Sequence, residues 1–237
     1  MGSKDIVREF TVCSNHVTVH VPAHCAGEGL LDSERNVRYS QQQASNSWNQ
    51  HADDNGRNEG CAQKPSCGQE RTDARSGQHT DKANPSLPDS LPAVYLHVHD
   101  GNGSEVLRLC RELGYPDFIL AAIRPRCWND DLTPWECPGL FADDAPFAGK
   151  ATEQLRLLES EIIPRVERNT PRKPEQRVLA GYSLAGLYAT WATFNSAAFG
   201  RIASASGSLW YPDFTGYAQA TEFARKPACA YFSLGSK

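Results

Sequence analysis

The sequence predicts an α/β fold, with a mostly parallel sheet and helices on both of its faces. After residue 92, short continuous apolar runs alternate with segments of helical period. Continuous apolar strands of this kind are typical of parallel sheets whose two faces are both covered. The 237 residues are also enough for one such domain with a sizeable core.

The chain before this region has two different parts. Residues 9–22 contain β-branched side chains in partial alternation and predict one or two strands of a leading hairpin. Residues 40–90 contain almost no aliphatic side chains, so they cannot bury enough apolar surface to offset the entropy of ordering. We therefore expect N-terminal strands within 1–39, a disordered polar insertion at 40–90, and an α/β core in 91–237.

Within the core, strands and helices are expected in strict alternation. The long segment 124–149, with four prolines, predicts a loop over one end of the sheet. Ser104 is expected to cap the first helix, and Pro164 to kink or shorten the second. The predicted strands are 93–98, 118–123, 178–180, 202–205 and 228–233, and the predicted helices are 104–113, 151–168, 184–195 and 214–224.

Composition excludes several classes of function. The net charge is -4 and there is no basic run, so we expect no nucleic-acid partner. No apolar stretch approaches the ~20 residues of a membrane span, and the first residues lack the apolar segment of a signal peptide. We therefore expect a cytoplasmic protein whose eight cysteines are reduced. Nothing implies a cofactor, and the cysteine spacings fit no common metal site.

One short stretch carries the chemistry, VLAGYSLAGLYA at 178–189, in which Ser183 joins an apolar strand to a helix. A serine nucleophile on such a strained turn needs small residues two positions before and after it. Gly181 and Ala185 meet that need. The sequence thus predicts that Ser183 is a nucleophile, rather than part of a turn that only packs the helix against the sheet.

Two backbone N–H groups are expected to stabilise the oxyanion formed by attack of Ser183. The first is the N–H of Leu184, at the start of the following helix. The second is expected from the loop after an earlier strand, at Asp100 or Gly101, and the sequence does not choose between them.

Four segments together resemble a known family: VYLHVHDGNG, GYSLAGLYATWA, SGSLWYPDF and AYFSLGSK. They are similar to the Putative esterase branch of the α/β-hydrolase superfamily, which includes siderophore esterases and esterase D. The resemblance covers residues 92–237. It implies an α/β-hydrolase fold and cleavage of small-molecule carboxylic esters or thioesters through an acyl-enzyme on Ser183.

The difficulty is the catalytic base. The family takes an acid and then a histidine from positions after the nucleophile, yet none of the seven histidines follows Ser183. We expect that the sequence is a fragment lacking the last strand, the last helix and the rest of the triad, and that it has little esterase activity. Asp213 is the alternative acid, although we interpret it as a turn residue.

Upstream histidines give further alternatives. His99 could approach Ser183 as a substitute base. His97, His99 and Asp100 also resemble part of a metal site, but the pattern is incomplete and we expect no metal. Two other functions remain open: a non-catalytic binding module, and an acyltransferase on the same serine. Trp128, Trp135 and Phe141 would either form a substrate pocket or pack the loop onto the sheet.

Overall fold

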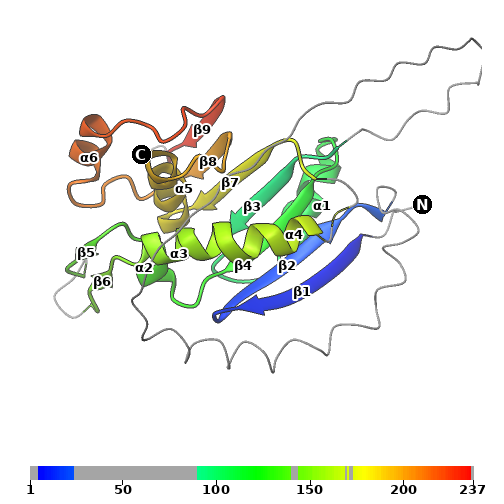
Figure 1. Cartoon of the computed structure of the whole chain (residues 1–237), viewed down its shortest axis with the longest axis horizontal. Coiled ribbons are helices and arrows are strands. Elements are labelled where there is room, and N and C mark those ends of the chain that lie inside the picture. Colours follow the sequence, from blue (N-terminus) through cyan, green and yellow to red (C-terminus); the bar gives the residue numbers. More distant parts are fainter. Residues whose placement is uncertain (1–4, 24–89, 140–143, 169, 171–172, 236–237) are drawn as a thin grey trace, which may run out of the picture. The chain divides into compact units, whose positions relative to one another are not determined.

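The computed structural model describes residues 5–23, 90–139, 144–168, 170 and 173–235 (Figure 1). The predicted insertion at 40–90 lies outside the described residues except for Ser90, and Phe141 lies outside them as well. The prediction of three parts therefore stays a prediction.

A seven-stranded sheet forms the centre of the described structure, in the spatial order β1-β2-β4-β3-β7-β8-β9. A two-stranded ribbon, β5-β6, lies in the segment that was expected to be a loop. The strands are β1 (Ile6–Val12), β2 (Asn15–Val21), β3 (Ala93–His97), β4 (Ile119–Arg124), β5 (Glu136–Cys137), β6 (Phe147–Ala148), β7 (Arg177–Tyr182), β8 (Arg201–Ala205) and β9 (Cys229–Ser233).

Five of the seven strands are parallel, which confirms the predicted fold class. β4, β3, β7, β8 and β9 run in one direction, while the leading hairpin β1–β2 joins the edge of β4 in antiparallel pairing. In the centre, His97 of β3 is in register with both Ile123 of β4 and Gly181 of β7. The carboxyl ends of these three strands therefore reach one edge of the sheet together.

Helices connect the strands, and Figure 1 shows α3 and α4 crossing in front of the sheet. The alternation of apolar strands with helical segments predicted helices on both faces, and side-chain contacts confirm this. The helices are α1 (Ser104–Glu112), α2 (Trp128–Asp131), α3 (Ala151–Leu157), η4 (Leu158–Ile162), α4 (Ile163–Arg168), α5 (Leu184–Asn195) and α6 (Phe214–Ala220).

One face is contacted by α3 and α5, because the buried ring of His97 lies against Tyr188 of α5 and within 3.2 Å of Gln154 Nε2 of α3. The other face carries the start of α1. A side chain at Gly103 would come within 2.7 Å of Leu120 and 2.9 Å of Ala122, whose side chains alternate with those facing α3.

The start of α1 differs from the expectation. Ser104 is the first helical residue and not the cap, which is Gly103 at φ 82°. The side-chain oxygen of Asn102 accepts the N–H of Ser104 at 3.1 Å and so replaces the expected serine cap.

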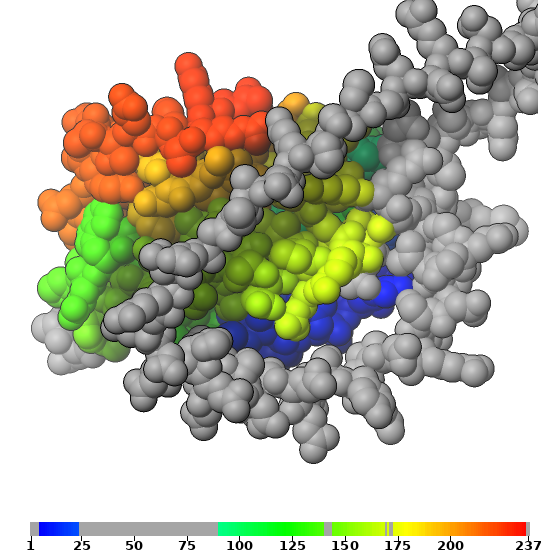
Figure 2. Space-filling view, in the orientation of Figure 1, coloured from blue at the N-terminus to red at the C-terminus, as the bar shows by residue number. Residues whose placement is uncertain are grey.

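The predicted helix 151–168 is continuous but not uniform. A π-helical segment, η4, separates α3 from α4, and Pro164 follows at the second residue of α4. Because proline has no N–H, the chain needs one helical hydrogen bond fewer at this point, and the wider π turn accommodates the ring without a break. Figure 2 shows this helical segment, in yellow-green, between the N-terminal hairpin (blue) and the C-terminal residues (orange to red).

Three observations concern membrane spans, metal sites and cysteines in the described residues. No helix in the described ranges is long and apolar enough to cross a membrane. Within the same ranges, no group of three or more His, Cys, Asp or Glu side chains is placed to hold a metal ion. The cysteines at positions 13, 110, 127, 137 and 229 are free thiols.

Candidate active site

Ser183 lies at the joint between β7 and α5, with φ 57° and ψ -122°. A non-glycine residue at positive φ is strained, and such strain gathers at functional sites. The strain is held by backbone hydrogen bonds on both sides. The Ser183 N–H donates to Ala205 O at 3.1 Å, and the Ser183 carbonyl accepts from Gly186 and Leu187 of α5.

The residues around this turn must be small because neighbouring atoms leave no room for a larger side chain. A Cβ on Gly181 would overlap the Cβ of Ala185 and lie 2.5 Å from its carbonyl carbon. A Cβ on Gly186 would lie 2.7 Å from Ser204 Oγ and 2.8 Å from Gly207 Cα. Real Cβ atoms do not approach other atoms this closely. The strand, the turn and α5 therefore fit only with glycine at these two positions.

Ser208 is the side-chain partner of Ser183 among the described residues. The two Oγ atoms are 3.2 Å apart, and the Ser208 N–H donates to the Ser183 carbonyl at 3.0 Å. Ser208 is buried and follows β8, the strand beside β7. Ser208 was not predicted from the sequence, although its place in Ser-Gly-Ser, directly after the strand that follows the nucleophile, could have indicated it.

The loop after β3 leaves the sheet edge next to the Ser183 turn, because β3 and β7 are neighbours. The His20 ring Nε2 is 2.7 Å from the Asn102 carbonyl, and the Val98 N–H donates to Ile123 O at 2.9 Å. Asp100 and Gly101 are exposed between these anchors, and Gly101 has φ 77°. Both residues thus lie in the loop that follows β3, beside the end of β7, and their role as oxyanion donors stays a prediction.

Leu184 is the first residue of α5 and is itself buried. The N–H groups of a first helical turn have no acceptor within the helix, and they carry the positive end of its dipole. This position agrees with the predicted role of the Leu184 N–H as an oxyanion donor, a role that stays a prediction.

His97 is not a base for Ser183. Burial lowers its pKa from 6.5 to about 3, so the ring is neutral at physiological pH. Its Nε2 is 3.2 Å from Gln154 Nε2, which also donates to Asn15 Oδ1 at 2.9 Å, while Nδ1 is buried without a hydrogen-bond partner. His97 is therefore a core residue.

His99 points elsewhere as well. Its Nδ1 is 2.8 Å from the carboxylate of Asp100, and its ring edge contacts Trp128 with the centroids 5.3 Å apart. Among the described residues, no histidine forms a hydrogen bond with Ser183 Oγ. The suggested approach of His99 to Ser183 is not seen.

Among the described residues, no hydrogen bond joins Asp213 to Ser183. Asp213 precedes α6 with φ 63°, and its carbonyl accepts the N–H of Tyr217 at 2.9 Å. Its side chain is exposed and does not cap the helix. The interpretation of Asp213 as a turn residue agrees with these contacts, which use its backbone.

The tryptophans of segment 124–149 have different surroundings. The Trp135 indole N–H donates to the Pro212 carbonyl at 3.1 Å, and the Tyr211 hydroxyl donates to the Trp135 carbonyl at 2.7 Å. Trp135 thus packs this segment onto the residues before α6. Trp128 instead lines a pocket of about 440 Å³ together with His99. The packing interpretation thus agrees with the contacts of Trp135, and the substrate-pocket interpretation stays a prediction for Trp128.

Comparison with known proteins agrees with this geometry. The family model described as "Putative esterase" matches residues 90–232, more than half of the chain and the whole Ser183 turn. The chain belongs to the Putative esterase family. This confirms the resemblance to the family.

One curated relative matches this esterase-family chain at low sequence identity. "Uncharacterized protein YbbA" of Bacillus subtilis (strain 168) is 31% identical over 156 residues, which are 62% of this chain and 62% of the relative. The chain thus spans less than two thirds of that curated relative.

Two solved structures are similar in fold. An IroE-like serine hydrolase from Shewanella oneidensis has a TM-score of 0.50 at 24% identity, over 55% of this chain and 45% of the other. The enterobactin and salmochelin hydrolase IroE has a TM-score of 0.50 at 18% identity, over 92% of this chain and 69% of the other.

Replacing Ser208 with alanine should slow the reaction of Ser183 with a fluorophosphonate by about three- to tenfold, because one hydrogen bond to its hydroxyl is lost. The rate is measured by gel fluorescence over time. Ser206→Ala is the matched control, since Ser206 is exposed in the same loop. Equal rates in the two variants would show that Ser208 does not position the nucleophile.

Proposed function

We propose that this chain cleaves carboxylic esters of small molecules by forming an acyl-enzyme on Ser183. The observation that carries the proposal is the conformation of Ser183, at φ 57° between a parallel strand and α5. Membership of the Putative esterase family supports it, because the matched region includes this turn. A thioester is the alternative substrate of the same chemistry.

The proposed reaction has two steps. Ser183 Oγ attacks the ester carbonyl carbon, the carbonyl oxygen becomes an oxyanion, and the serine proton passes through a base to the leaving alcohol. Water then attacks the acyl-serine, which releases the acid and restores the hydroxyl. The N–H of Leu184 and an N–H of Asp100 or Gly101 would donate to the oxyanion in both steps.

The base is the part that the described residues do not supply. Among the described residues, Ser183 Oγ forms its side-chain hydrogen bond with Ser208 Oγ and not with an imidazole. This observation favours a second candidate function, a binding module that keeps the fold and binds esters without cleaving them. An acyltransferase would use the same serine, with an alcohol in place of water.

The test is covalent labelling of the full chain with a fluorophosphonate, followed by mass spectrometry of the labelled peptide. We expect slow labelling of one residue, Ser183, because the described residues supply no base, and complete loss of labelling in Ser183→Ala. Labelling needs an activated hydroxyl, so it separates a nucleophile from a serine that only packs. Ser160→Ala is the matched control, since Ser160 is an exposed serine on η4.

The two candidates predict different results. Labelling at Ser183 with release of p-nitrophenol from p-nitrophenyl acetate supports the esterase, and added alcohol acceptors then distinguish transfer from hydrolysis. An unlabelled Ser183 in a folded chain would refute the nucleophile and leave the binding module. A cytoplasmic location stays our prediction, and cell fractionation checks it.

A further inference from the structure

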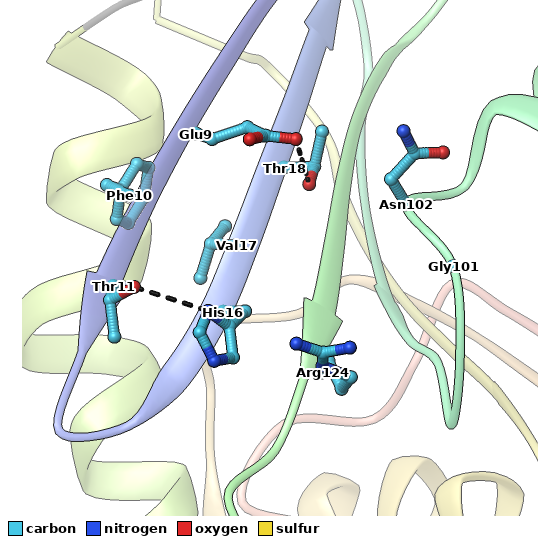
Figure 3. A pocket seen from close by; sticks show the side chains of 9 residues that line it. All are labelled: Glu9, Phe10, Thr11, His16, Val17, Thr18, Gly101, Asn102 and Arg124. Atoms are coloured by element: carbon cyan, nitrogen blue, oxygen red, sulfur yellow. Dashed lines mark hydrogen bonds between the residues drawn. The ribbon is translucent and has the colours of Figure 1, made fainter.

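A second set of side chains lies beside the candidate active site, in two adjoining pockets that share His16 and Arg124. The first, of about 580 Å³, lies over the hairpin and includes Gly101 and Asn102 (Figure 3). The second, of about 440 Å³, contains two arginines and two histidines and no acidic residue; it is lined by Ser14, His16, His99, Arg124, Pro125, Arg126 and Trp128.

Arg124 is the centre of this arrangement. It is the last residue of β4 and is directly opposite His16 of β2 in the antiparallel register, so the two side chains share one face of the sheet. Figure 3 shows Arg124 between His16 and the loop that carries Gly101. Arg124 is exposed, and among the described residues no hydrogen bond or ion pair engages its guanidinium.

The nearby acidic groups have other partners. Asp131 is buried, lies 3.4 Å from Arg126, and accepts the N–H of Cys127 at 2.8 Å. Asp100 pairs with His99 at 2.8 Å. The carboxylates of these two residues are therefore directed to partners other than Arg124.

Glu9 lines the first pocket and accepts from the Thr18 hydroxyl at 3.4 Å. Glu9 is opposite Thr18 in the register, two residues along β2 from His16. The second pocket does not include it. The charge of the second pocket is consequently positive, and an anion is the complementary ligand.

The position relative to Ser183 follows from the sheet. β3 lies between β4 and β7, and its residue His97 pairs with Ile123 of β4 and with Gly181 of β7. The next residues of the two outer strands, Arg124 and Tyr182, therefore lie at the same level along the sheet. Two strand spacings place their backbones about 10 Å apart. The loop after β3 joins the two places, since it carries His99 of the second pocket and the predicted oxyanion donors.

We propose that this second pocket binds a carboxylate on the substrate, so that the preferred substrates are esters bearing a free acid group about 10 Å from the scissile bond. Arg124 is the main ligand, because its planar guanidinium can donate two parallel hydrogen bonds to a carboxylate. His16 and the Ser14 hydroxyl supply further donors, and Trp128 forms an apolar wall. The proposal rests on Ser183 as the site of ester cleavage.

The test measures binding without turnover. In the full chain carrying Ser183→Ala, calorimetry compares monomethyl suberate with dimethyl suberate, which has the same length and no charge. We expect the charged ester to bind about tenfold or more tightly, with the preference falling as salt is raised. Arg124→Gln should abolish the preference, whereas the matched control Arg201→Gln, an exposed arginine at the start of β8, should keep it.

Equal binding of the two esters, no binding of either, or a preference that survives Arg124→Gln would overturn the proposal. Free acetate and phosphate are titrated in parallel. If they bind as well as the charged ester and also depend on Arg124, the pocket is a general anion site and the substrate assignment is wrong. Because the binding assay does not use the serine, an unlabelled Ser183 in the folded parent chain would refute the esterase separately.

Discussion

Gly181→Ala should destabilise the chain by about 3 kcal/mol or more and abolish labelling of Ser183. The added Cβ would lie 2.5 Å from the carbonyl carbon and oxygen of Ala185, so backbone must move. Overpacking of a core commonly costs ~1–3 kcal/mol, and a clash with backbone is relieved less easily than one with a side chain. Any movement changes the turn that holds Ser183 at φ 57°. Urea unfolding gives the free energy, and the fluorophosphonate reports the turn.

Gly216→Ala is the matched control, since a Cβ on Gly216 in α6 meets no atom within 4 Å. There the change should be neutral or stabilise by about 0.5–1 kcal/mol, because alanine favours a helix. Gly181→Ala should thus lower the free energy of unfolding, whereas Gly216→Ala should leave it unchanged or raise it. If Gly181→Ala were as stable and as reactive as the parent chain, the close contact between β7 and α5 would not exist.

Acid should destabilise the chain through His97 at a pH where carboxylates are still ionised. Burial lowers the folded-state pKa of His97 from 6.5 to about 3, and Nδ1 has no hydrogen-bond partner. Between these two values the unfolded chain binds a proton that the folded chain does not. The contribution of His97 to stability is therefore complete above pH 6.5 and falls as pH decreases toward 3.

The expected loss attributable to His97 between pH 7 and pH 5 is about 2 kcal/mol. The free energy of unfolding, measured by urea at both pH values, should fall by about that much more in the parent chain than in His97→Gln. Ser160→Ala is the control, because Ser160 is an exposed serine of η4 that carries no titrating group, and it should keep the pH dependence of the parent chain. Identical pH dependence in the parent chain and His97→Gln would show that His97 titrates normally and is not buried.

Most of the core could be predicted from the sequence because its elements have strong local patterns. The helix expected at 184–195 is α5 (Leu184–Asn195), and the strand expected at 118–123 is β4 (Ile119–Arg124). The predicted helix 214–224 is shorter, ending at Ala220. Helix ends depend on a few weak interactions, so their positions are less determined by pattern than their existence.

Other features depend on contacts that no local pattern contains. The π segment η4 before Pro164 and the ribbon β5-β6 within a proline-rich segment were not expected. The ribbon packs through Phe147 against Tyr211, more than 60 residues later in the chain. A short element of this kind is stabilised by its tertiary neighbours, and two residues of strand carry too little pattern to be recognised.

Some residues of the candidate site could likewise be predicted from local sequence patterns, and others could not. The Ser183 turn was predictable because a strand, a small-residue turn and a helix follow one another directly. The neighbour Ser208 and the pair His16 and Arg124 were not, because each contact joins separate strands through the sheet order. Sequence gives the order of strands along the chain, and it does not give their order in space.

That spatial order also determines how the protein can fold. The hairpin β1–β2 needs only a two-residue turn and can form within microseconds. Its partner β4, however, begins about 100 residues after β2 ends, and closing so long a loop costs entropy that grows with the logarithm of its length. Docking of the hairpin against β4 is therefore a long-range step, whereas the hairpin itself is local. His16 meets Arg124 only in that long-range step, so the second pocket forms when the hairpin docks.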